Sequence, residues 1–254
     1  NATPDSFSDG GKYLDKAVAV EHGLRLAAEG ADIIDIGGQS TRPYAEPVDI
    51  DEELRRVIPV VDELSRETLL PISVDTSKAR VAREAANAGA QIVNDVTALA
   101  GDELMLETVV ELEMAVCVMH MQGTPQTMQL NPTYEDVLSE ITEFLGRRRE
   151  ELIQAGVDPE RIAVDPGIGF GKKHQHNLKL LSNAWRLHEL GSPVLVGHSR
   201  KTFVGRVLGD EEADRTAGTI GVALSLARQG IQILRVHDVG PVRHPGEELP
   251  RRRG

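Results

Sequence analysis

The chain of 254 residues is poor in cysteine and in aromatic side chains. Its single cysteine, Cys117, excludes an intrachain disulfide and favours a reducing compartment such as the cytoplasm. Aromatic residues make up only 3% of the chain. The core must therefore be aliphatic, and Val, Ile, Leu and Ala are the residues that fill the interiors of α/β barrels.

Long apolar runs and net positive charge are also absent. No stretch approaches the ~18 apolar residues that span a bilayer, and no signal peptide is visible, so we expect no membrane partner. The formal net charge of −12 argues against binding to nucleic acid. Any binding site for an anion must be a local exception to this acidic surface.

What the sequence does contain is a regular alternation of short and long apolar segments. The short segments are rich in Val and Ile and show little polar alternation, which is typical of parallel strands that are buried on both faces. We predict seven such strands, at residues 31–36, 71–74, 91–93, 115–119, 161–164, 193–196 and 231–236.

Amphipathic helices are predicted between these strands. Apolar residues recur with helical spacing from Leu54 to Val61, and a long helix is expected over residues 134–155. Ser77 is a candidate N-cap for the helix that contains Val81. Glycines that suit a left-handed C-cap follow four predicted helices: Gly30, Gly89, Gly156 and Gly191.

Alternating strands and helices predict a parallel α/β fold with right-handed crossovers. Seven strands, with an eighth expected before Asn1, favour a (β/α)8 TIM barrel over residues 1–242; its first strand would be missing from this chain. A doubly wound open sheet is the alternative. Pro241 and Pro245 leave room only for a short or irregular last helix, and residues 243–254 are expected to form an irregular tail.

The segments that follow the predicted strands are unusually polar, and in barrels these segments carry the active site. They read DIGGQSTRP at 35–43, DTSK at 75–78, ND at 94–95, MHMQG at 119–123, DPGIGFGK at 165–172, GHSRK at 197–201 and RVHD at 235–238. Because geometry brings seven such ends to one rim, we expect a single pocket there.

The residue types of this rim point to a ligand. The cations Arg42, Arg200, Lys201 and Arg235 suit phosphate oxygens. The acceptors and the amide of another group suit a flat heterocycle with N–H donors: Asp75, Asn94 and Asp165. We therefore predict a planar heterocycle that carries a phosphate or diphosphate.

Taken singly, these residues also admit structural roles. Asp75 or Asp165 alone can be a helix cap, and His120 and His198 can be packed histidines bonded to backbone. Cys117 is expected in the core, and no nucleophilic Ser or Cys is assigned.

Together with NATPDSFSDGG at 1–11, the strand-end segments resemble the dihydropteroate synthases, a pterin-binding family of TIM barrels. The resemblance runs in order from residue 1 to about Val242. It implies a transferase of folate biosynthesis that joins 4-aminobenzoate to (7,8-dihydropterin-6-yl)methyl diphosphate and releases diphosphate. It also implies a homodimer, a magnesium ion, a cytoplasmic location and inhibition by sulfonamides.

Carried over position by position, the resemblance implies a role for each site residue. The pterin pocket would be lined by Asp75, Asn94, Asp165 and Lys201. The diphosphate would be held by Arg235 and His237 with Thr41 nearby, and Asn1 would contact Mg²⁺. The aminobenzoate would be flanked by Arg42, Pro43, Phe170, Lys201 and Thr202. The catalytic set would be Lys201, Asp75, Asp165, Arg235 and His237, and the C–O bond to diphosphate would break before the amine attacks.

Three positions depart from the family pattern: Ala2 replaces Val, Gln39 replaces Glu and Tyr44 replaces Gly. Gln39 removes a negative charge, and Tyr44 adds bulk beside the expected aminobenzoate site. We hypothesise that these two changes alter loop order and sulfonamide affinity, which Gln39→Glu with Tyr44→Gly would test.

Two other functions compete with the synthase. A pterin-binding methyltransferase domain of cobalamin-dependent systems would share the pterin-facing acids but lack the SRK and STRP segments. A non-catalytic homologue would bind pterin without turning it over.

Overall fold

The computed structural model describes residues 1–2, 12–41, 45–210, 212 and 214–244. In these residues seven short strands alternate with helices, as predicted. The strands are β1 (Ile34–Gly37), β2 (Ile72–Asp75), β3 (Ile92–Asp95), β4 (Ala115–Met119), β5 (Ile162–Asp165), β6 (Leu195–Gly197) and β7 (Ile233–Arg235). The α-helices are α1 (Lys12–Ala28), α2 (Ile50–Glu67), α3 (Ala79–Asn87), α4 (Met105–Glu111), α5 (Val137–Gln154), α6 (His174–Ser182), α7 (Thr202–Leu208), α8 (Thr216–Arg228) and α9 (Val239–Arg243). The short 3-10 helices are η2 (Pro159–Arg161) and η3 (Ala184–Leu190).

All strand pairs are parallel, and the strands neighbour one another in sequence order. Strands β1 to β5 form one sheet, β6 pairs with β7, and a bridge between Val164 and Val194 connects the two groups. A doubly wound sheet would reverse its order at one point. The order found here does not reverse, so the barrel prediction is confirmed and the open-sheet alternative is wrong.

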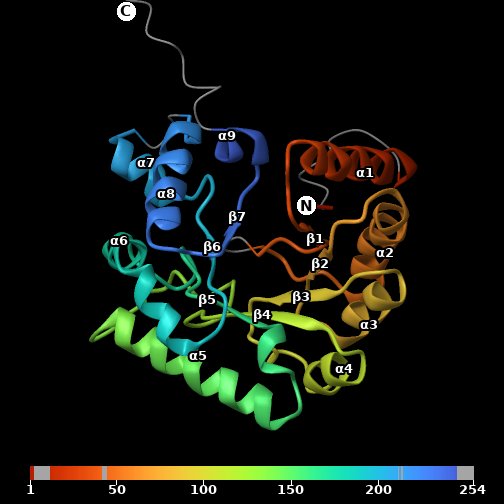
Figure 1. Cartoon of the computed structure of the whole chain (residues 1–254), viewed down its shortest axis with the longest axis horizontal. Helices are drawn as coiled ribbons and strands as arrows, with labels where there is room; N and C mark the ends of the chain where they lie inside the picture. The colour runs from red at the N-terminus through yellow and green to blue at the C-terminus, as the bar shows by residue number, and fades with distance from the viewer. Residues whose placement is uncertain (3–11, 42–44, 211, 213, 245–254) are drawn as a thin grey trace, which may run out of the picture.

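The helices lie outside the strands, and α9 lies at the same end of the molecule as α1 (Figure 1). The backbone N–H of Gly240 in α9 donates to Glu29 Oε2 at 3.2 Å, and Arg243 pairs with Asp32 at 3.0 Å. These contacts bring the last helix beside α1 and β1, as in a ring that closes. Helix α9 has five residues, which confirms the prediction of a short last helix. The eighth strand expected before Asn1 and the tail boundary at residue 243 stay predictions.

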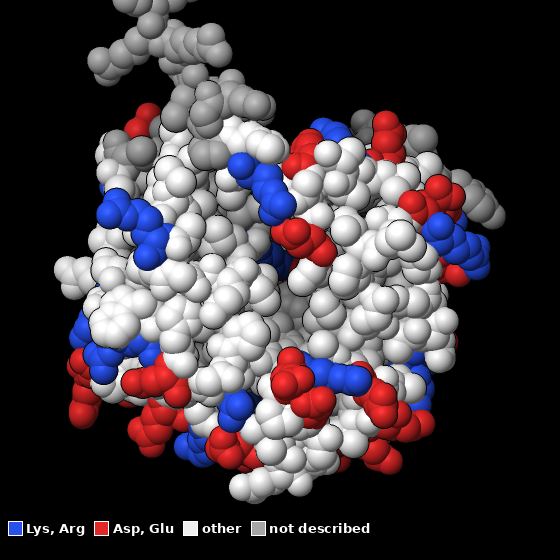
Figure 2. Space-filling view, in the orientation of Figure 1, with Lys and Arg blue, Asp and Glu red and all other residues white. Residues whose placement is uncertain are grey.

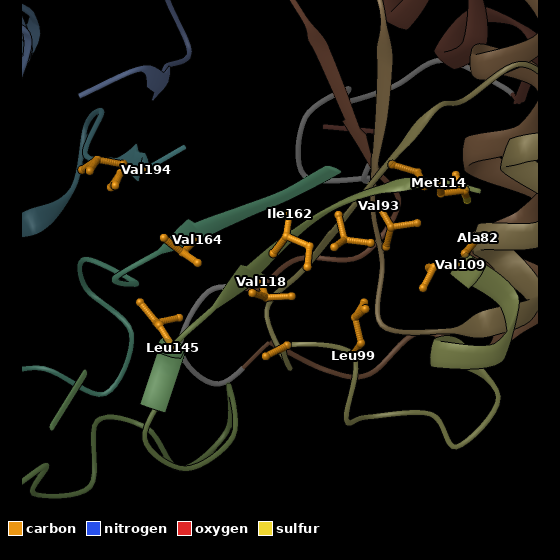
Figure 3. Packing of buried hydrophobic residues seen from close by; sticks show 14 of the residues in the cluster. Ala82, Val93, Leu99, Val109, Met114, Val118, Leu145, Ile162, Val164 and Val194 are labelled. Atoms are coloured by element: carbon orange, nitrogen blue, oxygen red, sulfur yellow. The ribbon is translucent and has the colours of Figure 1, made fainter. Parts of the chain in front are cut away.

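The core is aliphatic, as the scarcity of aromatic residues predicts. Figure 3 shows Val93, Val118 and Ile162 of the sheet packed close to one another, with Leu145 of α5 nearby. Each of these side chains is at most 1% exposed. Burial of this kind stabilises a fold by about 25 cal/mol per Å² of apolar surface. Cys117 is also buried, as expected.

The observed bounds of the helices and strands differ slightly from the predicted ones. The long helix begins at Val137 rather than at residue 134, because Asp136 Oδ1 accepts from the N–H groups of Leu138 and Ser139. The strands begin up to three residues later than predicted and mostly end one residue later, so Gly37 and Asp165 belong to strands. The four glycines expected at C-caps all have positive φ.

The prediction that Ser77 caps α3 is wrong. Its hydroxyl donates instead to Asp95 Oδ1 at 2.5 Å. The first N–H of the helix, that of Ala79, donates to Asp102 Oδ2 at 2.9 Å. A carboxylate that is distant in sequence therefore satisfies the helix end, and local sequence spacing could not reveal it.

The surface carries charges of both signs. Figure 2 shows basic and acidic side chains next to one another around the helices on the face in view, with uncharged surface between them. None of the helices in the described segments has the length and apolarity that crossing a bilayer requires.

Candidate active site

The C-terminal ends of β1, β2 and β3 are level with one another, which places polar side chains side by side. In the strand register, Gly37 lies opposite Asp75, and Asp75 lies opposite Asn94. The side chains of Asp75 and Asn94 are buried, as is Asp165 at the end of β5. The strand ends thus bring together three of the residues that the sequence predicted for a heterocycle pocket.

Arg235, at the end of β7, connects two of these strands. Its Nε donates to Asp35 Oδ2 at 2.6 Å, and its Nη2 donates to Asp75 Oδ2 at 2.7 Å. Asn94 Nδ2 donates to the same oxygen of Asp35 at 3.3 Å. Asp35 therefore contacts two predicted site residues. Asp35 belongs to the polar segment 35–43, but its sequence context does not indicate which residues it contacts, so no role was predicted for it.

The two carboxylates that share Arg235 differ in their electrostatics. Burial raises the pKa of Asp75 to about 7, with the Asp35 charge adding to this effect and Arg235 opposing it. Burial also acts on Asp35, but Arg235 and nearby hydrogen-bond donors outweigh it and lower its pKa. Both charges raise the pKa of Arg235, so the guanidinium stays protonated. Near neutral pH, Asp35 therefore stays ionised as the counter-ion of Arg235, and Asp75 is the carboxyl group that can take up a proton.

Lys201, which follows β6, lies beside the loop that follows β5. Its Nζ donates to the backbone oxygen of Ile168 and lies 4.6 Å from the centroid of the Phe170 ring. Loss of solvent lowers the pKa of Lys201 to about 8, while the charge of Asp165 opposes this shift. Burial raises the pKa of Asp165, while Lys201 opposes that shift. The predicted neighbours Phe170, Lys201 and Asp165 are therefore together.

Glycine is required where the loop after β5 meets Lys201. Gly169 has a φ of +84°, and a Cβ there would lie 3.2 Å from Lys201 Cδ. The positive φ disfavours other residues whatever the space around them. Gly169 thus lets the loop backbone approach the lysine side chain closely.

His237 lies beyond β7, next to the loop that follows β6. Its Nδ1 lies 3.1 Å from Ser199 Oγ, and its backbone N–H donates to the same oxygen at 3.3 Å. Loss of solvent and the charges of Arg200 and Arg235 lower the pKa of His237 to about 4. The ring is neutral near pH 7, and its Nε2 is the nitrogen that does not face Ser199.

Arg200 forms an ion pair that its sequence context does not reveal. Its guanidinium pairs with Asp238 at 2.6 and 2.9 Å, and its backbone has a positive φ of 56°. Arg200 thereby joins the loops after β6 and β7. The interpretation of Arg200 as a phosphate-facing cation stays a prediction.

The remaining predicted residues lie at the edges of the site. The N–H of Ala2 donates to Gly37 O at 2.8 Å, which places Asn1 near the end of β1. Thr41 is half-buried in the segment after β1, and Thr202 is exposed as the first residue of α7. Arg42, Pro43 and Tyr44 lie outside the described residues.

Gln39 lies against a buried ion pair. Its Oε1 accepts from Lys78 Nζ at 2.6 Å, and that ammonium also bonds Glu53, a carboxylate of α2 that is 1% exposed. Glu53 additionally accepts from Thr76 Oγ1 at 2.6 Å. Because Glu53 already neutralises Lys78, an amide at position 39 leaves no charge unbalanced.

Both histidines for which a packed role was considered are buried. His198 is 0% exposed, and its Nε2 lies 3.1 Å from the backbone oxygen of Thr219. His120 is 8% exposed and contacts Phe144 edge to face, with 4.9 Å between ring centroids. Lys172, for which the sequence predicted no role, bonds His120 and is 3% exposed.

The described residues contain no group of three or more His, Cys, Asp or Glu side chains that could hold a metal ion by themselves. Magnesium commonly keeps water and takes only one or two protein ligands together with substrate phosphates. The bond from the Ala2 N–H to Gly37 O places Asn1 at the end of β1, and Gly37 lies opposite Asp75. One amide side chain at this place fits a magnesium ion that is held mainly by the oxygens of a diphosphate.

Comparison with known proteins identifies the family of the chain. The family described as "Pterin binding enzyme" matches residues 1–237. The dihydropteroate synthase of Haemophilus influenzae is 48% identical over 239 residues, which cover 94% of this chain and 86% of that protein.

Solved structures show the same similarity. The dihydropteroate synthase of Xanthomonas albilineans with 4-aminobenzoic acid is 47% identical and superimposes with a TM-score of 0.90, covering 96% of this chain and 88% of that one. The Yersinia pestis enzyme in complex with a sulfonamide drug is 44% identical, with a TM-score of 0.89 and the same coverage. The chain therefore belongs to the family of pterin-binding enzymes, among the dihydropteroate synthases.

Proposed function

We propose that this chain joins 4-aminobenzoate to the (7,8-dihydropterin-6-yl)methyl group of a pterin diphosphate and releases diphosphate. It is a transferase of folate biosynthesis. The observation that carries this proposal is the arrangement of side chains at the strand ends: Arg235 stands between the carboxylates of Asp35 and Asp75, and Lys201 lies beside Phe170. A heterocycle with donors and an anionic substituent matches both groups of side chains.

The pterin ring would lie against Asp75, Asn94 and Asp165. Carboxylate oxygens accept from ring N–H and amino groups, and an amide can both donate and accept. Asp165 Oδ1 already accepts from the backbone N–H of Gly167 at 2.7 Å, which fixes the orientation of that carboxylate. Three groups on three strands would thus define the plane of the ring.

Departure of diphosphate would be assisted by Arg235 and His237, with Thr41 nearby. Only two of the five N–H donors of Arg235 are occupied by Asp35 and Asp75, so others can bond phosphate oxygens. Ser199 holds the His237 ring by Nδ1, which leaves Nε2 for an oxygen of the leaving group. A magnesium ion bound to the diphosphate and Asn1 would neutralise the charge that develops there.

The arylamine would then attack the exocyclic methylene carbon. In the dissociative course, the C–O bond breaks first and its electron pair leaves with diphosphate; the amine lone pair then forms the C–N bond, and the nitrogen loses a proton. Asp75 and Asp165 would stabilise the transient positive charge on the pterin-methyl group. Phe170, Lys201 and Thr202, with Arg42 and Pro43, would position the aminobenzoate.

Measuring diphosphate release from the two substrates with Mg²⁺ tests this proposal. Release that depends on aminobenzoate supports the synthase, whereas pterin binding without release would support a non-catalytic binder. Methyl transfer to a cobalamin would support the competing methyltransferase. Lys201→Ala should nearly abolish turnover, and a kcat/KM close to that of the parent would remove the role assigned to Lys201.

We also propose that the chain forms a homodimer through its late helices. Helix α8 exposes Leu224, which is 51% exposed, on the same face as Gly221, where an added Cβ would meet no atom within 4 Å. Val207 of α7 and Trp185 of η3 are also exposed. Leu224→Glu should convert a dimer to monomers in analytical ultracentrifugation. The single unpaired cysteine is in keeping with the cytoplasmic location that we propose.

A further inference from the structure

Lys172, near the end of the loop after β5, has a buried amino group to which the proposed reaction assigns no role. The side chain is 3% exposed. Its Nζ lies 2.8 Å from Phe170 O, 3.2 Å from His120 O and 3.1 Å from His120 Nδ1. The amino group is thus bonded by two backbone oxygens and an imidazole, and these come from two different loops.

The two loops pack backbone against backbone. A Cβ at Gly167 would lie 2.0 Å from His120 O, and a Cβ at Gly171 would lie 2.5 Å from Gln122 O. Both glycines also have positive φ, so another side chain would be strained at either position. Such contact leaves backbone oxygens enclosed, and buried oxygens need donors. Lys172 supplies donors to two of them.

The loop that Lys172 holds is the one that contacts Lys201. Ile168 O accepts from Lys201 Nζ, and the Phe170 ring lies 4.6 Å from that nitrogen. Phe170 is therefore bonded through its carbonyl to Lys172 and faces Lys201 through its ring. A short run of backbone, residues 168–172, connects the two lysines.

Holding a loop in place does not by itself require a buried amine. Tyr134 Oη already donates to Gly171 O at 2.7 Å, and Gln129 Nε2 donates to Gly169 O at 2.8 Å. Burial lowers the pKa of Lys172 to about 7, although the Asp165 charge opposes the shift. Protonating a buried amine costs free energy, and two neutral donors already bond this loop. The amine of Lys172 therefore has a function other than holding the loop in place.

We propose that Lys172 is a positioning residue, which sets the Ile168 carbonyl and the Phe170 ring against Lys201 from the far side of the loop, with His120 as its acceptor. This inference rests on the role proposed above for Lys201 in binding. It predicts that Lys172 and Lys201 are energetically coupled, because removing Lys172 displaces the groups that orient Lys201.

The test is a double-mutant cycle on the binding of 7,8-dihydropteroate, measured by calorimetry in full-length Lys172→Met, Lys201→Met and the double variant. Binding is used because it can be measured in variants that do not turn over. Lys179→Met is the matched control, since Lys179 pairs with Asp136 on the surface, where both side chains are 48% exposed. His120→Leu and His120→Asn form a second pair, because the Asn oxygen can replace the Nδ1 acceptor and Leu cannot.

Lys172→Met should weaken binding about tenfold in the parent and less than twofold in the Lys201→Met background. His120→Leu should follow Lys172→Met, and His120→Asn should restore most of the affinity. Equal losses in both backgrounds, or no loss in the parent, would overturn the inference. If Lys172→Met does not fold, the His120 pair in the same cycle decides the question.

The rate of amide hydrogen exchange in residues 165–172 reports how well the loop is held in place and needs no ligand. Exchange about tenfold faster in Lys172→Met than in Lys179→Met supports the positioning role, and equal exchange overturns it. This readout separates the two proposals: a parent protein that binds no dihydropteroate would count against the proposed function, whereas unchanged exchange counts against Lys172 alone.

Discussion

The two sides of the barrel mouth hold their cations in different ways. On the β1–β3 side, Arg235 bonds two carboxylates, those of Asp35 and Asp75. On the β5–β6 side, Lys201 and Lys172 bond backbone oxygens, Lys172 also bonds the His120 ring, and neither bonds a carboxylate of the described residues. The cation of the first side is thus paired with negatively charged groups, whereas the amines of the second side are paired with neutral, dipolar groups.

This difference sets what each side can do near neutral pH. Both carboxylates raise the pKa of Arg235, which keeps its charge. Loss of solvent lowers the pKa of Lys201 to about 8 and that of Lys172 to about 7, so these amines can lose their protons. A permanent cation suits a polyanionic leaving group, whereas adjustable amines suit the contact with neutral rings.

The largest expected effect comes from removing the permanent cation. Arg235→Met should lower kcat/KM by about 10³-fold, since it removes a donor to the leaving group and leaves two buried carboxylates unpaired. Steady-state diphosphate release measures this loss. Arg243→Met is the control, because Arg243 pairs with Asp32 on the surface, and it should change kcat/KM less than twofold. Comparable losses in both variants would mean that the fold, rather than the site, had been damaged.

The Asp75 carboxyl group should determine how kcat/KM falls at acidic pH. Burial raises the pKa of Asp75 to about 7, so its charge is lost as pH falls through that value. If the charged form supports the pterin-methyl cation, kcat/KM should fall about tenfold per pH unit below 7 and reach about a hundredfold loss near pH 5. Asp75→Asn should be slow at every pH and should lack this fall. A fall that persists in the variant would assign the titration to another group.

The strands and the rim could be predicted because their signals are local. Runs of Val and Ile mark strands, and polar residues after each run mark the rim. Asp75, Asn94, Asp165 and Lys201 were found in this way, and the structure brings them to one mouth. The roles assigned to them stay predictions, since proximity alone does not establish what each one binds.

Other parts of the site could not be predicted, because they depend on contacts between distant segments. Asp35 was left without a role, since nothing in β1 reveals that Arg235, 200 residues later, bonds it. Arg200 was predicted as a cation of the rim, and its pairing with Asp238 across two loops could not be read from the sequence. Local sequence shows where a charge stands along the chain, and only the fold shows which charge it meets.

The buried amine of Lys172 should also affect how the free energy of unfolding depends on pH. Lys172 has a folded pKa of about 7 against an ordinary 10.5. Between these values the unfolded chain binds the extra proton, so the contribution of Lys172 to stability rises with pH above 7 and is lost as pH falls to 7. Between pH 7 and 9 this rise should be roughly 2 kcal/mol in the free energy of unfolding.

Urea denaturation at both pH values would measure this rise. Lys172→Met should lack it, and Lys179→Met should retain it, because Lys179 stays exposed beside Asp136. Identical slopes in the two variants would show that the buried amine is not the group that titrates.

The smallest effect is expected from the ion pair at the surface. The side chains of Arg200 and Asp238 are 55% and 36% exposed, and pairs of this kind contribute about 0–1 kcal/mol. Asp238→Asn should therefore lower the free energy of unfolding by at most about 1 kcal/mol and change kcat/KM less than threefold. Both quantities should be measured at low and at high salt, because screening weakens an exposed pair. The Ser199–His237 contact lies in the same two loops and does not use Asp238, so His237 should keep its place. A loss of kcat/KM above about tenfold would show that the Arg200–Asp238 pair orients His237. A cation that keeps its charge would then be needed in the loops after β6 and β7 as well as at the strand ends.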